Sequence, residues 1–294
     1  MKQILVTGAA GFIGRHLIAS LIKVKNISLK AFDQNPDLTG IFPTVKTIVG
    51  DIRDQKKLRE VFVKEPPEAI IHLAAVIKSS HREDYLKVNV QGTENLIRLA
   101  ENFNTRKFIF ISTDYVLYNL PDYYSQSKRR CEEIISSSNL NFTIFRPAPV
   151  FGSGDNKNFA TLISIIKKYP ILPAIKCQME PVYVGDVIKM IIASLDNSCS
   201  DRKIYNLPGG SIYEFPKILS ILSKSLGLKR LIITLPEKFF LPALQLYESL
   251  VPNPLLSVYQ VQKWIKNRPL DASLVKKDLN YNPVSFEERV RSIF

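Results

Sequence analysis

The sequence predicts an α/β protein with a doubly wound parallel sheet and a smaller C-terminal lobe. Two observations predict this class. Short runs rich in Ile, Val, Leu and Phe alternate with helical patterns through the first half of the chain, and each run ends near Gly, Asp, Ser or Pro, as strands do. Continuous apolar strands separated by helices are typical of a parallel sheet covered on both faces, with right-handed crossovers.

Six strands are expected before residue 148, at 3–8, 28–33, 45–51, 68–75, 107–113 and 141–147. The helices between them are expected at Phe12–Lys23, Gln55–Val63, Tyr85–Asn102 and Tyr124–Ser137. We therefore predict a first domain over residues 1–147, which binds its ligand at the carboxyl ends of the strands.

The pattern loosens after Pro147. Helices are expected near 160–168, 186–195, 215–226 and 236–250, between short strands at 181–184, 203–207 and 231–234. These elements predict a lobe over residues 148–294 that mainly binds substrate and is interleaved with the first domain.

The formal charge of +13 over 294 residues suits an anionic partner, which can be nucleic acid, a membrane surface or a phosphorylated substrate. The alternative is a general surface bias, because the lysines are spread along the whole chain. No dense basic block interleaves with aromatic residues, which argues against nucleic acid.

Three cysteines without metal-like spacing cannot all pair, so we expect a reducing, cytoplasmic compartment and no disulfide framework. The histidines show no metal pattern, and no metal site is expected. The N-terminus has no signal-peptide cleavage pattern. No apolar run reaches the ~18 residues of a spanning helix. The stretch that comes closest, residues 239–261, is interrupted by Glu248, Asn253 and three prolines.

A glycine turn follows the first expected strand in "VTGAAGFIGRHL". Gly8 permits a tight turn, Gly11 lets the backbone approach a pyrophosphate, and Gly14 allows the helix to pack closely on the strand. The start of the next helix offers free N–H groups and a positive dipole end to a phosphate. This context predicts a dinucleotide site.

Two carboxylates follow later strands. Asp33 ends the second strand, where it can accept hydrogen bonds from a ribose 2′-hydroxyl and repel a 2′-phosphate, so NAD is favoured over NADP. The alternatives are that Asp33 only caps a turn and that Arg15 assists a 2′-phosphate. Asp51 follows the third strand, where it can receive an adenine amino group.

Nine motifs occur in order: the glycine turn, "GDIRD", "HLAA", "NVQGTENL", "FISTDYV", "YSQSK", "RPAPVFG", "PVYVGDV" and "YNLPGG". Together they resemble the extended short-chain dehydrogenase/reductase family of nucleotide-sugar epimerases, dehydratases and reductases, over nearly the whole chain. The resemblance implies a Rossmann sheet, bound NAD and a nucleotide-sugar substrate. It also implies a possible homodimer, formed through the helices that carry "NVQGT" and "YSQSK".

The same resemblance implies a catalytic set of Thr113, Tyr124 and Lys128. Tyr124 and Lys128 lie at i and i+4 and share one helix face. A lysine ammonium beside the phenol is expected to lower the Tyr124 pKa, so that Tyr124 exchanges a proton with a sugar hydroxyl. Lys128 can also hold the nicotinamide ribose, and Thr113 can bond the same substrate oxygen. Tyr123 is not expected to be the catalytic tyrosine, because the residue at its i+4 position is Ser127 and not a lysine.

The remaining site residues are also implied by the matching motifs. The expected cofactor contacts are Gly8, Gly11, Phe12, Ile13, Gly14, Asp33, Asp51, Ile52, Leu73, Ala74, Ala75, Asn89, Tyr124, Lys128 and Pro147. The expected substrate contacts are Thr113, Asp114, Asn158 and Arg268, with Arg268 at a position that clamps the diphosphate in relatives.

Three departures from the family restrict the reaction. The loop between Val116 and Tyr124 is short, which leaves the pocket open on one side or covered from elsewhere. Tyr115 stands where 4,6-dehydratases place Glu, which argues against elimination, and "STDYV" is similar to 4-keto-sugar reductases. Pro149 replaces the Asn of many epimerases, so diphosphate binding is assigned to residues 157–159 and Arg268.

The sequence therefore predicts an NAD-dependent nucleotide-sugar epimerase or oxidoreductase that acts at the sugar C4. One alternative is a 4-keto-sugar reductase or dehydrogenase with exchangeable NAD(P)H. A second is a dinucleotide-binding protein without turnover.

Overall fold

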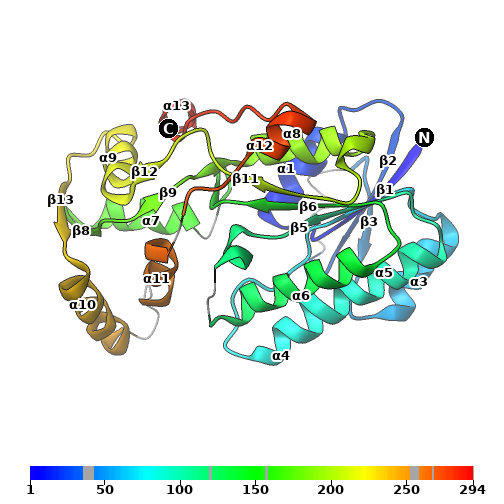
Figure 1. The fold of residues 1–294 in the computed structure, drawn as a ribbon, viewed down its shortest axis with the longest axis horizontal. Helices are drawn as coiled ribbons and strands as arrows, with labels where there is room; N and C mark the ends of the chain where they lie inside the picture. Colours follow the sequence, from blue (N-terminus) through cyan, green and yellow to red (C-terminus); the bar gives the residue numbers. More distant parts are fainter. Residues whose placement is uncertain (36–42, 119–120, 156–157, 252–257, 267, 294) are drawn as a thin grey trace. The chain divides into compact units, whose positions relative to one another are not determined.

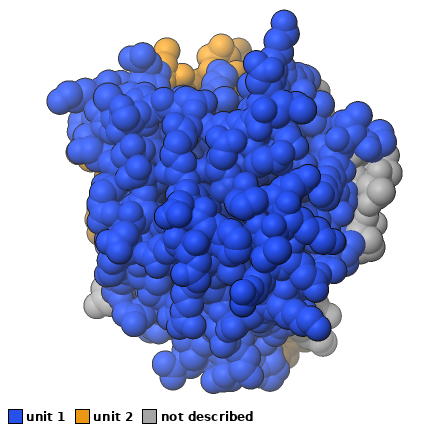
Figure 2. Space-filling view, turned by 90° about the vertical axis from the view of Figure 1, so that its right-hand side faces the viewer, with its two compact units in different colours: residues 1–147, 187–206, 272–281 blue, residues 148–186, 207–271, 282–294 orange. Residues whose placement is uncertain are grey.

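The computed structural model describes residues 1–35, 43–118, 121–155, 158–251, 258–266 and 268–293, which form two compact units. Unit 1 comprises Met1–Pro147, Val187–Asn206 and Ala272–Tyr281, and unit 2 comprises Ala148–Asp186, Leu207–Asp271 and Asn282–Phe294. Figure 1 shows the elements of both units, and Figure 2 shows one face of unit 1 in blue. The chain leaves unit 1 after Pro147 and returns to it twice.

Unit 1 is built on a seven-stranded sheet. Its order is β3 (Lys46–Val49), β2 (Ile27–Asp33), β1 (Lys2–Thr7), β4 (Ala69–His72), β5 (Lys107–Ile111), β6 (Phe142–Pro147) and β11 (Lys203–Leu207). Neighbouring strands from β3 to β6 are parallel. The doubly wound parallel sheet is therefore confirmed. The strand order reverses between β1 and β4, which is the point where such sheets bind their ligands.

Helices cover both faces of this sheet (Figure 1). One face carries α3 (Gln55–Lys64), α5 (Gly92–Asn102) and α6 (Tyr123–Ser137), and the other carries α1 (Phe12–Leu21), α8 (Val184–Ser194) and α12 (Ser273–Leu279). On the first face a buried cluster joins helices to strands, and it includes Leu58, Phe62, Leu96, Phe108 and Ile135. Burial of each such side chain stabilises the folded state by about 1.5–3 kcal/mol.

Three elements differ from the sequence prediction. The helix expected near 186–195 was assigned to the C-terminal lobe, but most of it, as α8, belongs to unit 1. The continuous helix expected over Tyr85–Asn102 is instead a short α4 (Arg82–Asp84) and a π-helical turn, η1 (Tyr85–Gln91), followed by α5. The strand at 203–207 was expected in the C-terminal lobe, but it is β11 and pairs with β6. The reason is that Tyr205 is buried and stacks on Phe145, with ring centroids 5.7 Å apart, so this strand completes the core of unit 1.

Unit 2 contains α7 (Asn158–Lys168), α9 (Phe215–Ser225), α10 (Glu237–Leu250), α11 (Val258–Lys266) and α13 (Phe286–Ile293). Three two-stranded sheets accompany them: β7 (Val150–Phe151) with β10 (Val182–Tyr183), β9 (Gln178–Met179) with β12 (Tyr213–Glu214), and β8 (Ile171–Ile175) with β13 (Leu231–Leu235). Phe286 is fully buried at the centre of the core, where its ring meets that of Phe151 at 4.8 Å. Across the described ranges, no helix is long and apolar enough to cross a membrane.

Candidate active site

The glycine turn after β1 lies directly against the chain that follows β4. Gly8 has φ +71°, and a Cβ atom placed there would lie 2.5 Å from the backbone nitrogen of Ala74. A Cβ atom on Gly14 would lie 2.4 Å from the carbonyl oxygen of Gly8. Neither position has room for a side chain. Gly11 precedes the first residue of α1, so the turn presents the free N–H groups of a helix N-terminus, which suit a pyrophosphate.

Asp33 at the end of β2 is tied to the same turn. Its Oδ2 accepts a hydrogen bond from the backbone N–H of Ala10 at 3.0 Å, and its Oδ1 accepts one from Asn35 at 2.9 Å. A carboxylate has about four acceptor positions, so Asp33 can still receive ribose hydroxyls. The structure thus brings together the glycine turn, Asp33 and Ala74 at the carboxyl edge of the sheet.

Asp51 is held by a partner that the sequence analysis missed. Arg53 donates to its carboxylate from Nε at 2.9 Å and from the backbone N–H at 2.8 Å. The side-chain hydrogen bond from Arg53 keeps the pKa of Asp51 below its usual range. The neighbouring Ile52 is buried, and its carbonyl accepts from Asn95 Nδ2 at 3.1 Å. Asp51 is therefore a charged hydrogen-bond acceptor that forms an ion pair with Arg53.

His72 forms a buried hydrogen-bond chain at the end of β4. Its Nδ1 lies 2.7 Å from Thr7 Oγ1, and its Nε2 lies 2.9 Å from Thr93 Oγ1. Thr93 Oγ1 donates to the Asn89 carbonyl at 2.6 Å, so Thr93 accepts from Nε2–H and Nδ1 accepts from Thr7. Burial, with a smaller effect of the Lys128 charge, lowers the pKa of His72 to about 3. The imidazole is therefore neutral.

Asn89 links the chain after β4 to α6. Its Oδ1 accepts from the backbone N–H of Val76 at 2.8 Å, and its Nδ2 donates to the Val76 carbonyl at 3.0 Å and to Ser127 Oγ at 2.9 Å. Asn89 lies in the π-helical turn, a distortion that is frequent at functional sites. Asn89, expected to contact the cofactor, thus also positions the helix that carries Tyr124 and Lys128.

Tyr124 and Lys128 lie near the start of α6, which Asp122 caps by accepting from the Ser125 N–H at 2.9 Å. Tyr124 is half-buried and Lys128 is buried, with Nζ 4.0 Å from the centre of the Phe110 ring on β5. Within the described chain, neither the Tyr124 hydroxyl nor Lys128 Nζ has a hydrogen-bond partner. Tyr123, in contrast, is 47% exposed.

The electrostatics of this pair differ from the sequence prediction. Burial raises the pKa of Tyr124, and the charges of Asp114 and Asp122 act in the same direction. The expected lowering by Lys128 is therefore wrong for the protein alone, because lost hydration and two carboxylates dominate. Burial lowers the pKa of Lys128 to about 8, against the opposing effects of Cys131 and Glu132. Near pH 7 Tyr124 is a neutral phenol and Lys128 is mostly protonated.

Thr113 and Asp114 follow β5. Thr113 caps the short 3-10 helix η2 (Asp114–Leu117), because Oγ1 accepts from the Tyr115 N–H at 3.3 Å and donates to Asp114 Oδ1 at 3.2 Å. Asp114 is almost fully buried. The neighbouring Ser112 hydroxyl is buried, and no partner for it lies in the described part of the chain. Three polar side chains, Ser112, Thr113 and Asp114, therefore lie together at the carboxyl end of β5.

Glu132, one turn beyond Lys128, forms a buried ion pair that the sequence analysis did not identify. Arg146 Nε donates to its Oε1 at 3.0 Å and to its Oε2 at 3.1 Å. The Glu132 side chain is 6% exposed and the Arg146 side chain 20%. Arg146 directly precedes Pro147, the buried last residue of β6. The pair thus fastens α6 to β6.

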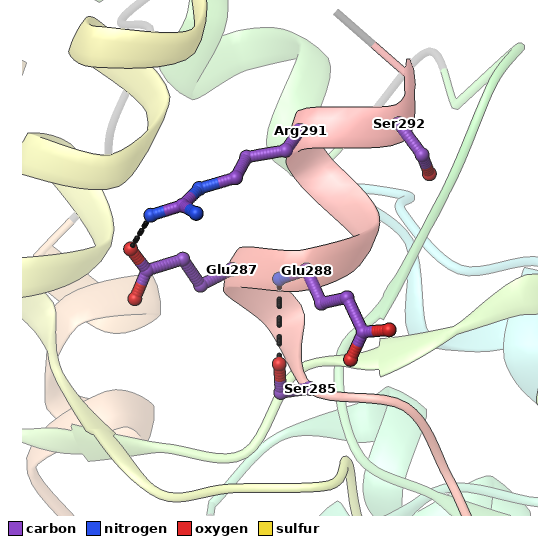
Figure 3. A pocket seen from close by; sticks show the side chains of 5 residues that line it. All are labelled: Ser285, Glu287, Glu288, Arg291 and Ser292. Carbon is purple, nitrogen blue, oxygen red and sulfur yellow. Dashed lines mark hydrogen bonds and ion pairs between the residues drawn. The ribbon is translucent and has the colours of Figure 1, made fainter.

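Two predicted substrate residues belong to unit 2. Arg268 is exposed, and its Nη1 donates to the Ile265 carbonyl at 3.3 Å. Asn158 begins α7, but its side chain lies outside the described residues, as does Lys157. A surface pocket of unit 2 is lined by Ser285, Glu287, Glu288, Arg291 and Ser292, which all lie on or beside α13 (Figure 3). It contains none of the predicted site residues.

No cluster of three or more His, Cys, Asp or Glu side chains is placed to hold a metal ion in the ranges that the structure covers. The residues predicted for the site offer backbone N–H groups, carboxylates, a phenol and an ammonium.

Solved structures with the same fold include a UDP-glucose 4-epimerase and an enzyme solved with NAD and UDP. The UDP-glucose 4-epimerase of Thermotoga maritima, solved with UDP-glucose, has a TM-score of 0.78 and 20% identity, over 99% of this chain and 97% of that chain. The enzyme WbmG of Bordetella bronchiseptica, solved with NAD and UDP, has a TM-score of 0.80 and 16% identity, over 98% and 91%.

Curated relatives are similar in sequence. A decarboxylating sterol-4-alpha-carboxylate 3-dehydrogenase of Schizosaccharomyces pombe is 31% identical over 192 residues, 57% of this chain and 55% of that protein. An N-acetyl-alpha-D-glucosaminyl-diphospho-ditrans,octacis-undecaprenol 4-epimerase of Escherichia coli O157:H7 is 28% identical over 234 residues, 69% and 66%. The matches span about half to two thirds of these relatives.

The model of the NAD dependent epimerase/dehydratase family matches residues 4–207, which cover the glycine turn, the Tyr124–Lys128 pair and all seven strands of the main sheet except the first two residues of β1. This confirms the resemblance seen in the sequence motifs. The chain belongs to the NAD-dependent epimerase/dehydratase family.

Proposed function

We propose that the protein is a nucleotide-sugar epimerase or oxidoreductase that acts at the sugar C4 through Thr113, Tyr124 and Lys128. The observation that carries this proposal is the Tyr124–Lys128 pair. Both side chains project from the first turns of α6, and each holds a polar group without a partner in the described residues. Because no side chain or backbone group of the described residues takes up their hydrogen-bonding capacity, both groups are available to bind and react with a ligand.

The cofactor of this family is NAD, and the residues present fit it. The turn at Gly8 and Gly14 is too close to neighbouring backbone for any side chain, as a pyrophosphate cradle requires. Asp33 would accept the adenosine ribose hydroxyls, and Lys128 would donate to the second ribose. When bound, NAD⁺ accepts a hydride and adds a positive charge that favours the phenolate of Tyr124.

The role of Tyr124 is proton exchange with the reacting hydroxyl. As the C4 hydroxyl becomes a ketone, its proton passes to the phenolate of Tyr124, and the phenol returns a proton when the ketone is reduced. Thr113 would hold the same oxygen with its hydroxyl. Because burial raises the pKa of Tyr124, the proton-donating phenol is the resting form of the protein alone.

An epimerase and a keto-reductase would use the same hydride and proton transfers at the sugar C4. Return of hydride to the other face of a rotated sugar would make the enzyme an epimerase, whereas a fixed sugar would make it a dehydrogenase or reductase. Tyr115 in place of a glutamate argues against a dehydratase. The 31% identity to a sterol dehydrogenase favours a second candidate, which is oxidation of a hydroxyl on an apolar substrate.

A substrate panel separates these functions. The protein is incubated with UDP-sugars, with 4-keto sugars and with sterols, each with NAD⁺ or NADH, and the products are identified by mass spectrometry and NMR. Conversion of a UDP-sugar to its C4 epimer without net NADH formation identifies an epimerase. Turnover of sterols alone would refute the sugar proposal, and bound NAD without any turnover would favour a dinucleotide-binding protein.

The unaltered protein is expected to bind NAD at least roughly tenfold more tightly than NADP. A 2′-phosphate beside Asp33 would meet a like charge, and one such contact is worth on the order of 1–4 kcal/mol. Replacing Asp33 by Asn should reduce the preference, because the amide keeps an acceptor for the Ala10 N–H but loses the charge. Calorimetric titration of both cofactors checks this. Tighter binding of NADP to the unaltered protein would refute it.

Replacing Arg268 by Ala is expected to weaken nucleotide-sugar binding roughly 10–100-fold and leave NAD binding unchanged, since a charge-assisted hydrogen bond is worth about 1.5–3 kcal/mol. Lys266→Ala is the matched control, because Lys266 is a nearby exposed cation at the end of α11. Competition by UDP and UDP-sugars measures the affinities. Equal losses in the two variants would show a general charge effect and remove Arg268 from the site.

A further inference from the structure

The helix α10 in unit 2 has an apolar face that the unit leaves uncovered. Phe240 and Leu244 of this helix are buried in the core of unit 2. Phe239, Leu246 and Leu250 lie on a separate face, at spacings of seven and four residues, and are 60%, 61% and 72% exposed. A surface helix normally carries polar residues there. Residues 239–250 of this helix belong to the apolar stretch 239–261.

The sheet of β8 and β13 continues this apolar character. Leu231 pairs with Ile171, and Ile233 pairs with Pro173. All four side chains are exposed, whereas Leu172 and Ala174, which alternate with Ile171 and Pro173 along β8, are buried. In Figure 1, β13 leads directly into α10. We call these seven exposed residues the apolar surface: Ile171, Pro173, Leu231, Ile233, Phe239, Leu246 and Leu250.

Basic residues lie close in the sequence to the residues of the apolar surface. Arg230 Nε donates to the Ile166 carbonyl at 2.6 Å, which ties the start of β13 to the end of α7. We call five basic residues the basic rim: Lys167, Lys168, Lys229, Arg230 and, on α10, Lys238. Two of these lysines lie beside aromatic rings, Lys168 at 5.3 Å from Tyr169 and Lys238 at 5.0 Å from Phe239.

Acidic residues are few in the same elements. The described residues of α7, β8 and β13 include none, and those of α10 include Glu237 and Glu248. Glu248 accepts a hydrogen bond from the Val258 N–H at 3.0 Å. The surroundings of the apolar surface are therefore positively charged, in keeping with the +13 of the whole chain.

We propose that the apolar surface and the basic rim bind the surface of an anionic lipid bilayer. Exposed apolar side chains enter the boundary between headgroups and acyl chains, and lysines and arginines at their edge are attracted to anionic headgroups. Lysine stems can lie along apolar surface while their ammonium groups stay in water. A symmetric pair of copies joined through this face would bring one basic rim against the other, which is unfavourable. The proposal does not depend on the substrate.

Co-sedimentation of the purified full chain with lipid vesicles tests this proposal. We expect binding to phosphatidylcholine vesicles that contain phosphatidylglycerol, weaker binding at high salt, and little binding to phosphatidylcholine alone. Leu246→Ser/Leu250→Ser should lower the partition coefficient about tenfold or more. Lys168→Glu/Lys229→Glu should lower it by a similar factor, since each basic residue near an anionic surface is worth about a factor of five.

Matched controls change the same residue types on unit 1. Ile22→Ser/Val63→Ser removes two exposed apolar side chains, and Lys23→Glu/Lys25→Glu changes the net charge by the same amount as the basic pair. Both should keep vesicle binding. As a direct probe, the fluorescence of Leu250→Trp should be quenched by brominated lipid more than that of the unaltered protein, whose single Trp264 packs on Phe215.

Three outcomes would overturn the proposal. The unaltered protein could fail to bind anionic vesicles at low salt. The unit 1 controls could lose binding as strongly as the unit 2 variants. Light scattering could reveal dimers that Leu246→Ser/Leu250→Ser dissociates, which would assign the surface to a second copy of the chain.

Discussion

Replacing Tyr124 by Phe is expected to lower turnover of a confirmed substrate by about 10²–10⁴-fold, the usual effect of a positioned acid–base group. The change removes only the phenolic oxygen and its proton. This hydroxyl has no partner within the described residues, so its loss should not disturb the fold, and NAD binding should stay close to that of the unaltered protein. Steady-state kinetics and an NAD titration on the same preparation measure the two effects.

Tyr123→Phe is the matched control. Tyr123 is the first residue of α6, lies about 100° around the helix from Tyr124, and is 47% exposed, so its change should alter turnover little. Lys128→Ala should lower both turnover and NAD affinity, because it removes the buried ammonium. Loss of turnover in Tyr123→Phe with an active Tyr124→Phe would place the catalytic phenol one residue earlier. Activity in both variants would leave α6 without a catalytic tyrosine.

Replacing Glu132 by Ala is expected to lower the free energy of unfolding by about 3–5 kcal/mol, the usual cost of removing one member of a buried ion pair. The remaining guanidinium of Arg146 would be buried in part without its two hydrogen bonds from Nε. Loss of the Glu132 charge also removes one of the effects that hold up the pKa of Lys128. Chemical denaturation of the full chain measures the change in unfolding free energy.

The next residue in the chain supplies a control. Glu133 pairs with Arg130 at 3.0 Å, but both side chains are more than half exposed, so Glu133→Ala should cost no more than about 1 kcal/mol. Replacing both Glu132 and Arg146 by Met should recover much of the lost stability, because no unpaired charge is then buried. If Glu132→Ala were as stable as Glu133→Ala, the pair would not fasten α6 to β6.

The local features of unit 1 were predictable from the sequence. The strands from β1 to β6 were placed to within a few residues, because each is an apolar run that ends at a turn residue. Gly8 and Gly14 were assigned the roles that the geometry supports, since only a missing side chain satisfies such close approaches. Asp122 could also have been found, because an Asp three residues before Ser125 at the start of a helical pattern is an N-cap signal.

Other features depend on contacts that no local pattern contains. Glu132 and Arg146 lie fourteen residues apart on different elements, and no local sequence pattern predicts that they form an ion pair. Asn89 lies in the π-helical turn, and its side chain forms hydrogen bonds with Val76 and Ser127. These contacts join separate segments, so helical periodicity alone predicted a regular helix there. The raised pKa of Tyr124 follows from burial near Asp114, which helix spacing does not reveal.

The buried chain through Thr7, His72 and Thr93 has a consequence for titration experiments. With a pKa of about 3, His72 stays uncharged over the whole range in which enzymes are normally assayed. The strand ends that it joins therefore keep the same hydrogen bonds from mildly acidic to alkaline solution. A limb of the pH–rate curve near neutrality cannot be assigned to the histidine beside the site. Under the proposed mechanism such a limb would report instead on Lys128, whose pKa burial lowers to about 8, because burial moves the pKa of Tyr124 further above neutrality.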